Sequence, residues 1–496
     1  MQPSPTSTTP EPGLTRVLLS ALLLTLAGDY LLWPATPGVS FSIFVLVSAI
    51  TLFCNRNREA YTRTAVAAFA LLIASVFQSA IELSVSNWLV LACLLLVLVG
   101  ETSFPALLPG WARWSEALLA FGKAPARWLW FGRVAKQVPL EAGPTGALFQ
   151  VLLPTVVLGG AFAFLLGSGN AIFASWMSKI VEEIWPLLPS FELSGRRLAL
   201  LGLLGTFALA LLRPAEASPV PRVWTRRIPT FSAPRNASIA YWRSVSMLGL
   251  LNVLFFAANT IDVVYLWIEG ALPDGVNYSA YVHQGVYSLI AAVLLAALVL
   301  ISIFQQAPAV TSSKAIKALS LVWIAQNGTL IASVLLRLKL YVDAYQLSEL
   351  RIYVAFFLVL VTAGFVFLSF HVLRPGNLNR LVFSNALATF ALFFVIQFLD
   401  VAKWVADDNV LRWQNDPHRT LDVAYLHSLG ASAWPALITA AETPGRQEAH
   451  AAFVTVHKLR ESQRRNLEEG NWRSWQWRTT SNARTLLERE IRTRQP

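Results

Sequence analysis

The chain has 496 residues, of which 55% are hydrophobic and 14% are charged. Soluble globular proteins carry about 25% charged residues, so the composition excludes an ordinary soluble protein and indicates an integral membrane protein. The net charge of +11 does not indicate a nucleic-acid partner, because most of the excess cations lie in short loops between apolar runs, where they set membrane topology.

Apolar runs alternate with polar loops along most of the chain. Residues 1–13 are rich in Pro, Ser and Thr and are expected to be a disordered cytoplasmic tail. A membrane span needs about 20 apolar residues, and about eleven runs come close to that length. The expected spans are 14–34, 39–54, 64–83, 87–104, 147–168, 196–212, 244–268, 283–305, 316–338, 350–373 and 380–404. The predicted fold class is therefore an all-α, polytopic transmembrane helical bundle.

The spans form two groups around a basic loop. An N-terminal bundle over 14–212 holds about six spans, and a C-terminal bundle over 244–404 holds about five. Residues 213–243 between them form a cytoplasmic basic loop. Residues 111–136 and 171–185 combine aromatic and charged residues in the pattern of amphipathic segments on the membrane surface.

The C-terminal region 405–496 has the composition of a soluble protein and is expected to be a small helical, extracytoplasmic tail. A domain of this size buries little surface alone, so the tail is expected to lean on the membrane-embedded part. Its predicted core consists of Tyr425, Leu426, Leu429, Trp434, Trp472 and Trp475.

The positions of Lys and Arg predict the orientation. The loops 55–63, 105–146 and 213–243 are rich in cations, whereas 35–38 and 269–282 contain none. Cytoplasmic loops carry the excess of Lys and Arg, so the N-terminus is predicted inside and the C-terminus outside. Arg196 and Arg197 do not fit this alternation, and pairing with acidic residues would explain them.

Polar side chains within the spans make up the candidate site, because each is costly in hydrocarbon. The predicted topology places them in the outer half of the bilayer. The candidate outer polar cluster is Asp29, Asn259, Asp262, His283, Arg337 and Asp400. In the alternative interpretation the acids only cap helices or reach the headgroups, and the asparagines only join helices.

Within this cluster, Arg337 is predicted to pair with Asp262, with Asp400 as the second candidate. A guanidinium inside a span is costly unless it is paired or reaches water. Asp262 and Arg337 lie at matching depths on spans that run in the same direction. The alternative is that Arg337 reaches the headgroups and touches no acid.

The sequence predicts no catalytic residue, cofactor or metal site. It contains no CxxC, HExxH, P-loop, GxSxG or GxGxxG motif. Its two cysteines, Cys54 and Cys93, are expected to be buried as small hydrophobic residues.

Two segments stand out for their sequence, residues 321–353 (LVWIAQNGTLIASVLLRLKLYVDAYQLSELRIY) and residues 471–478 (NWRSWQWR). They resemble a bacterial membrane family that is known only as a domain of unknown function, the 4153/4173 group. The other similar segments are 28–33, 252–296, 408–415 and 422–437. The resemblance implies residence in the bacterial inner membrane and a C-terminal region outside the cytoplasm, and it implies no activity.

Three functions remain open. The first is a non-enzymatic role in envelope sensing, scaffolding or regulation, with the lipid bilayer as one partner and an envelope protein as the candidate partner of the tail. The second is a secondary transporter or ion-coupled carrier that uses Asp262, Arg337 and Asp400. The third is a membrane enzyme acting on a lipid-linked substrate, which the small number of histidines disfavours.

Overall fold

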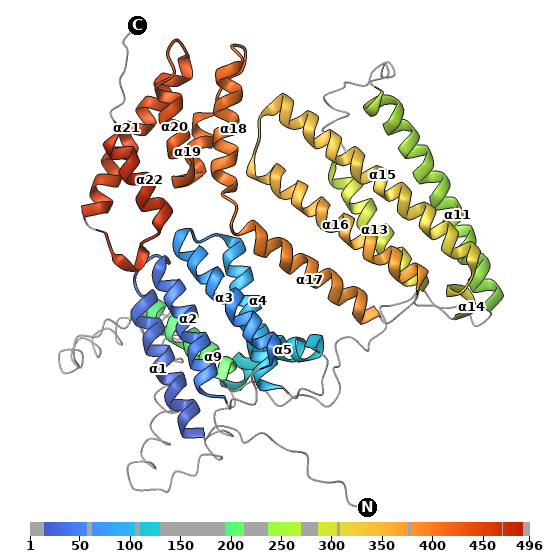
Figure 1. Cartoon of the computed structure of the whole chain (residues 1–496), viewed down its shortest axis with the longest axis horizontal. Helices are drawn as coiled ribbons and strands as arrows, with labels where there is room; N and C mark the ends of the chain where they lie inside the picture. The colour runs from blue at the N-terminus through green and yellow to red at the C-terminus, as the bar shows by residue number, and fades with distance from the viewer. Residues whose placement is uncertain are drawn as a thin grey trace, which may run out of the picture. The chain divides into compact units, whose positions relative to one another are not determined.

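The structure, a computed structural model, describes residues 14–56, 62–104, 110–128, 194–212, 237–268, 286–304, 308–374, 378–468 and 470–489. Every regular element in these ranges is a helix (Figure 1), as the fold class predicts. The chain divides into two compact units. Unit 1 comprises Met1–Ala80, Leu91–Pro221 and Asn471–Trp475, and unit 2 comprises Ile81–Val90, Arg222–Gly470 and Gln476–Pro496.

Seven described helical segments are long and apolar enough to cross a membrane: Arg63–Ile81, Val85–Ser103, Gly195–Leu212, Ala240–Trp267, Lys314–Tyr345, Glu349–Leu373 and Leu378–Ile396. Two shorter apolar helices, Val39–Cys54 and Ala292–Phe304, match further predicted spans. The chain is thus a polytopic helical membrane protein. Residues 1–13, the predicted span 147–168, the segment 171–185 and most of the loop 213–243 lie outside the described residues.

Unit 1 is built from α1 (Leu14–Leu32), α2 (Val39–Cys54), α3 (Arg63–Ile81), most of α4 (Val85–Ser103), α5 (Gly110–Trp128) and α9 (Gly195–Leu212), while the residues from Ile81 to Val90 belong to unit 2. Helix α1 packs against α2 and α9, and α5 also packs against α9. Gly28 allows this close approach, because an added Cβ atom would lie 2.8 Å from Phe44 and 2.9 Å from Leu204.

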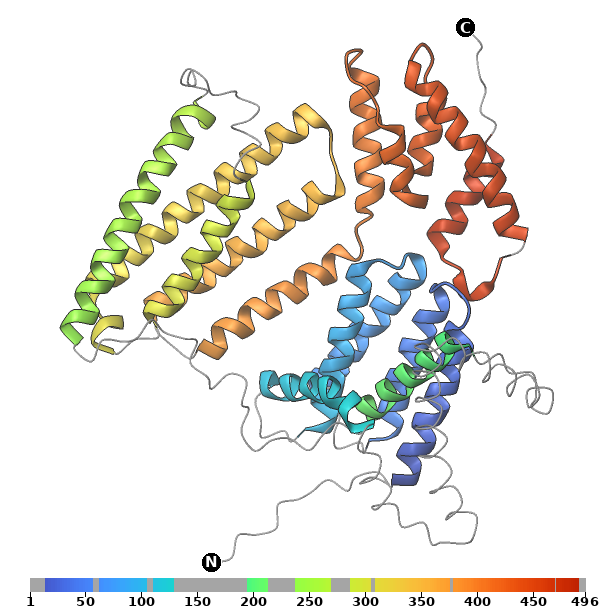
Figure 2. The ribbon, with the colours of Figure 1, turned by 180° about the vertical axis from the view of Figure 1, so that it is seen from behind.

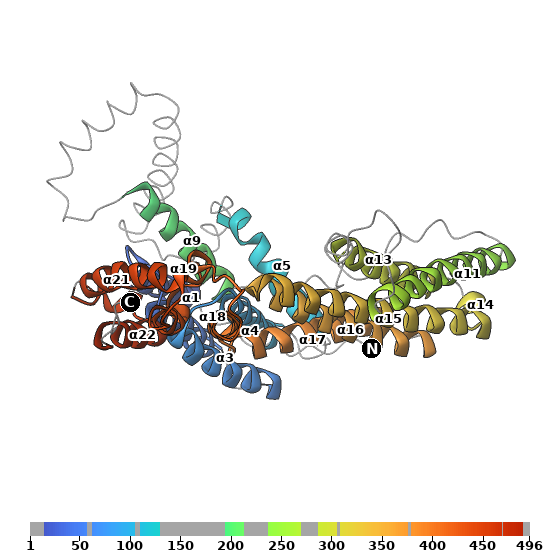
Figure 3. The ribbon, with the colours of Figure 1, turned by 90° about the horizontal axis from the view of Figure 1, so that it is seen from above.

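The membrane-embedded part of unit 2 contains α11 (Ala237–Asp262), the π-helical turn η3 (Val263–Trp267), α13 (Val286–Phe304), α14 (Pro308–Thr311), α15 (Lys314–Tyr345), α16 (Glu349–Leu373) and α17 (Leu378–Ile396). Neighbours pack in the order α11, α15, α16, α17 (Figures 1 and 2), and α13 lies against both α15 and α16 (Figure 3). The packed core includes Leu248, Leu300, Trp323 and Val334. We call the end of this bundle where α15 ends and α16 begins the tail-side end.

The last predicted span, 380–404, is not one continuous helix. Helix α17 ends at Ile396, and α18 (Val401–Asn415) begins after Asp400. The Asp400 side chain accepts a hydrogen bond of 2.9 Å from the backbone N–H of Lys403. Aspartate stabilises a helix N-terminus in this way, so Asp400 starts a new helix instead of lying inside the span.

The tail follows as α18, α19 (Val423–Ser428), η4 (Gly430–Ala433), α20 (Trp434–Ala441), α21 (Gln447–Glu468), η5 (Trp472–Ser474) and α22 (Trp477–Glu488). Helix α20 contacts α18, α21 and α22 (Figure 1). Gly430 has φ of +75°, a backbone conformation that glycine adopts without strain. The tail core, which lies in unit 2, includes Trp413, Leu426, Leu437, Val456 and Leu486.

Two predictions about burial are wrong. Trp472 and Trp475 were expected in the tail core but are 49% and 41% exposed, because η5 belongs to unit 1 and the tail core is filled by other helices. Cys54 and Cys93 are free and exposed. Each turns away from the helix contacts, so an apolar run alone did not reveal the side that packs.

Candidate functional site

A buried ion pair joins α11 to α15. Arg337 on α15 contacts the carboxylate of Asp262, the last residue of α11. Only 6% of the Arg337 side chain and 7% of the Asp262 side chain are exposed. The pairing predicted from their matched depths is therefore present. The backbone continues from Asp262 into the π-helical turn η3, a distortion that often occurs at functional sites.

Side-chain hydrogen bonds extend this contact along both helices. Asn252 Nδ2 donates to the backbone oxygen of Leu319 at 3.1 Å. One heptad later, Asn259 Nδ2 donates to the backbone oxygen of Gln326 at 3.0 Å. The partners advance together along the chain, so α11 and α15 run parallel. Asn259 therefore belongs to the same interface as the ion pair.

Asp400 lies in a different contact. Its carboxylate is 3.1 Å from Arg478 Nε of α22, so the second candidate partner of Arg337 pairs with another arginine instead. Asp29 lies in unit 1, where its two oxygens bind Arg197 of α9 at 3.0 and 2.5 Å. This bidentate pair agrees with the expectation that an acid accounts for Arg197. His283 lies outside the described residues.

Arg478 is bound by two carboxylates. Besides Asp400, its guanidinium pairs with Glu82, which precedes α4 and belongs to unit 2. Of the Arg478 side chain, 16% is exposed, and this burial lowers its pKa. We call Glu82, Asp400 and Arg478 the Arg478 clamp. It attaches α22 of the tail to the junction between α17 and α18.

Two neutral contacts also attach the tail at the tail-side end. Asn409 of α18 accepts from the backbone N–H of Leu347 at 2.8 Å and donates to its oxygen at 2.9 Å. The hydroxyl of Tyr425 accepts from the backbone N–H of Glu349 at 3.0 Å. Burial raises the pKa of Tyr425. These contacts supply hydrogen-bond partners for backbone groups between α15 and the first turn of α16, which lack partners within a helix.

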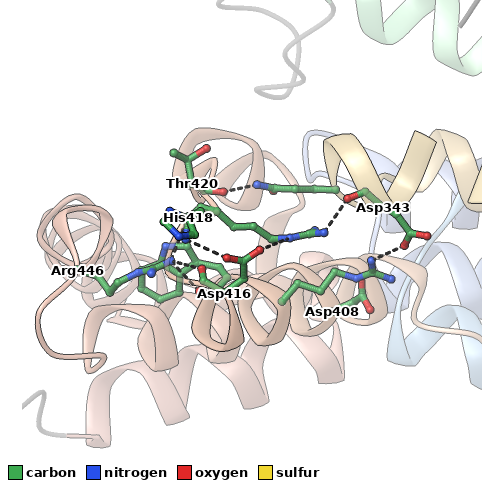
Figure 4. Close-up of polar contacts among 10 residues, drawn as sticks. Asp343, Asp408, Asp416, His418, Thr420 and Arg446 are labelled. Atoms are coloured by element: carbon green, nitrogen blue, oxygen red, sulfur yellow. Dashed lines mark hydrogen bonds and ion pairs between the residues drawn. The ribbon is translucent and has the colours of Figure 1, made fainter. Parts of the chain in front are cut away.

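A partly exposed network of arginines and aspartates joins the end of α15 to α18 and the loop after it (Figure 4). Asp343, near the end of α15, lies 2.9 Å from Arg412 of α18, while its backbone oxygen accepts from Arg419 at 2.7 Å. Arg412 also pairs with Asp408 at 2.7 Å. The hydrogen bond to Asp343 raises the pKa of Arg412, so the contacts favour its charged form.

Arg446 holds the loop after α18 in place. Its guanidinium donates to the backbone oxygens of Trp413, Asp416 and Arg419 at 2.7, 3.1 and 2.8 Å (Figure 4). It also lies over the Trp413 ring, 4.7 Å from the ring centroid. The backbone N–H of His418 donates to the Asp416 carboxylate and lowers its pKa.

Sequence analysis missed a buried acid in unit 1. Glu101 near the end of α4 binds Arg113 at 2.8 Å, Trp114 Nε1 at 2.9 Å and the Thr62 hydroxyl at 2.7 Å. Its side chain is fully buried. The only signal was an acid at the end of an apolar run followed by an Arg- and Trp-containing segment, and such acids often lie at the headgroups.

The described residues include no group of three or more His, Cys, Asp or Glu side chains that could hold a metal ion. Their charged groups instead form arginine–carboxylate pairs, which are suited to holding helices together and to responding to protons or ions.

Comparison with protein-family models gives a match to "Domain of unknown function (DUF4153)" over residues 41–440. No curated protein matches the chain, and neither does any solved structure.

Proposed function

We propose a function for this chain, which belongs to the DUF4153 family of unknown function. We infer that it acts without catalysis in the bacterial inner membrane. In this proposal the spans anchor the tail, and the tail senses or relays the state of the envelope to a protein partner. The N-terminus lies in the cytoplasm and the tail outside, as the cation-rich loops favour.

The Arg478 clamp carries the proposal. A single guanidinium between Glu82 and Asp400 attaches α22 beside the end of the last span. Partly exposed ion pairs weaken with added salt or with protonation of a carboxylate. Conditions in the outer compartment can therefore loosen the tail without unfolding the apolar spans, which is what an envelope sensor requires.

The test removes the clamp in the full-length chain. Arg478→Gln is compared with Arg484→Gln, a change on the same helix at an exposed arginine. The rate of tail cleavage by external protease and growth under acid or salt stress are measured in cells lacking the native copy. We expect Arg478→Gln to raise cleavage several-fold and to alter stress tolerance, and Arg484→Gln to do neither. Faster cleavage with unchanged tolerance would show a merely structural clamp and contradict the proposal.

The proposed orientation has its own test. Fusions of alkaline phosphatase and of green fluorescent protein to the C-terminus are compared in a Gram-negative host. Phosphatase activity without fluorescence supports an outer tail, and fluorescence without phosphatase activity rules it out.

A carrier is the second candidate, and the buried Asp262–Arg337 pair beside a π-helical turn favours it. Uptake of ions and protons by proteoliposomes containing the purified chain tests it. If the proteoliposomes take up ions or protons and Asp262→Asn abolishes this uptake, the carrier becomes the preferred function. A membrane enzyme acting on a lipid-linked substrate remains a prediction with no described geometry in its favour.

A further inference from the structure

Helices α11 and α15, which pack against each other, carry buried polar atoms with no hydrogen-bond partner among the described residues. They are Asn252 Oδ1, Asn259 Oδ1, Ser320 Oγ, Trp323 Nε1, Gln326 Oε1 and Asn327 Oδ1. Apart from half-buried Gln326, their residues are at most 9% exposed. Buried polar atoms in proteins nearly always have a partner, either protein or ordered water. Several unpartnered buried atoms on two helices that pack together therefore point to something bound beside them.

These atoms are distributed along the two helices and not gathered at one point. Asn252 bonds to α15 at Leu319, beside Ser320, and Asn259 bonds at Gln326, beside Asn327. Between these two levels, the Trp323 ring meets Phe255 edge-on with centroids 5.4 Å apart. At 1.5 Å per residue, the row from Asn252 to Asp262 spans about 15 Å of helix. It ends at the Asp262–Arg337 pair.

The chemistry of the row selects water as the bound species. The amide and hydroxyl oxygens need donors, whereas the indole N–H of Trp323 needs an acceptor. A cation would satisfy the oxygens but not the indole, and it would be repelled by Arg337 at the end of the row. Water donates and accepts, and a buried water typically bonds to about three otherwise unsatisfied groups.

We propose that the α11–α15 interface holds a file of ordered water molecules that runs from Asn252 and Ser320 to the Asp262–Arg337 pair. The unpartnered atoms bind the waters, and the asparagine Nδ2 bonds hold the two helices together beside them. The file brings water to an ion pair that the surrounding side chains otherwise bury. It does not depend on the sensing role or on the orientation of the chain.

Radiolytic labelling of the full-length protein in nanodiscs tests the proposal, because hydroxyl radicals formed from bound water oxidise adjacent side chains. The internal control is Trp413, which is as fully buried as Trp323 but has its Nε1 bonded to Glu448 at 3.4 Å within the tail core. We expect Trp323 to be oxidised at least ten-fold faster than Trp413. Equal, slow oxidation of both would overturn the proposal without any substitution.

Variants then locate the water. Asn252→Leu together with Asn259→Leu removes two oxygens of the row, and Asn385→Leu on α17 is the matched control, since Asn385 bonds within its own helix to Leu381. We expect the double variant to lower Trp323 oxidation at least three-fold and the control to leave it unchanged. Samples are compared only after each elutes as a single folded species. Rapid oxidation that both variants leave unchanged would show that water reaches Trp323 by another route, and the file would be wrong.

Discussion

The α11–α15 interface and the tail core are both buried, but different kinds of side chain hold them together. The tail core is filled by Trp413, Leu437, Ile438 and Val456, whereas asparagines and an ion pair join α11 to α15 in addition to apolar packing such as that of Phe255 on Trp323. The surroundings explain the difference. A region with the composition of a soluble protein gains from removing apolar surface from water. Helices in lipid gain nothing from that transfer, so polar bonds and close packing must join them.

The largest expected effect comes from the apolar side of this comparison. Trp413→Ala should lower the free energy of unfolding of the tail by about 4 kcal/mol, because it leaves a large cavity in a well-packed core. Protease resistance of the tail in the full-length protein as a function of urea measures this loss. Trp472→Ala is the control, since Trp472 is 49% exposed and should cost under about 0.5 kcal/mol. Equal losses in the two variants would mean that the tail core has been misidentified.

On the polar side, Arg337→Ala should destabilise the bundle by about 3 kcal/mol, because it leaves the Asp262 carboxylate buried without its cation. Adding Asp262→Asn should restore part of the loss. The midpoint of thermal unfolding in nanodiscs is measured for both single variants and the double variant. Strictly additive effects would contradict a direct pair, and the interface would then rest on the asparagines alone.

Where the two regions meet, Asn409→Leu should cost about 2 kcal/mol, since both backbone groups of Leu347 lose their partner. The change should release the tail and leave the spans intact. Amide hydrogen exchange is measured in residues 347–352, where we expect it to become faster, and in the tail core. Faster exchange confined to the tail core would show that Asn409 serves the tail alone.

A smaller effect should come from the cap of α19. The side chain of Asp422 accepts from the backbone N–H of Tyr425 at 2.8 Å, and Asp422→Ala should destabilise the tail by about 1 kcal/mol. Asp422→Asn, which can still accept, is the matched control and should lose little. Urea midpoints of tail protection compare the two, and identical midpoints would exclude a capping role.

The smallest effect is a pH dependence of the tail. The bond from His418 lowers the pKa of Asp416 below its ordinary value of about 3.9. A carboxyl whose pKa is lower in the folded protein adds stability above its unfolded pKa and loses it as the pH falls through the folded value. The tail should therefore lose a little stability as the pH falls below about 4. This loss should be smaller in the Asp416→Asn variant. Parallel pH curves for the two proteins would refute this contribution.

The sequence predicted the Asp262–Arg337 pair because the cost of a charge in lipid leaves few solutions and both residues were expected near the same end of their spans. The same reasoning did not reach the Arg478 clamp or the burial of Glu101. Arg478 lies in a segment with the composition of a soluble protein, where a paired arginine looks like any solvated one. The prediction that Trp472 and Trp475 lie in the tail core was wrong for the opposite reason. Aromatic residues in a short helical tail usually belong to its core, but here other side chains fill that core.

The asparagine bonds have one more property. Each asparagine of α11 donates to a backbone oxygen of α15, and a helix presents equivalent oxygens at every turn, about 5.4 Å apart. Such bonds hold two helices together without specifying which residues face each other. The Asp262–Arg337 contact is between two particular side chains, so it selects one alignment from a set that the asparagines treat alike. In this interface, adhesion and register are assigned to different residues.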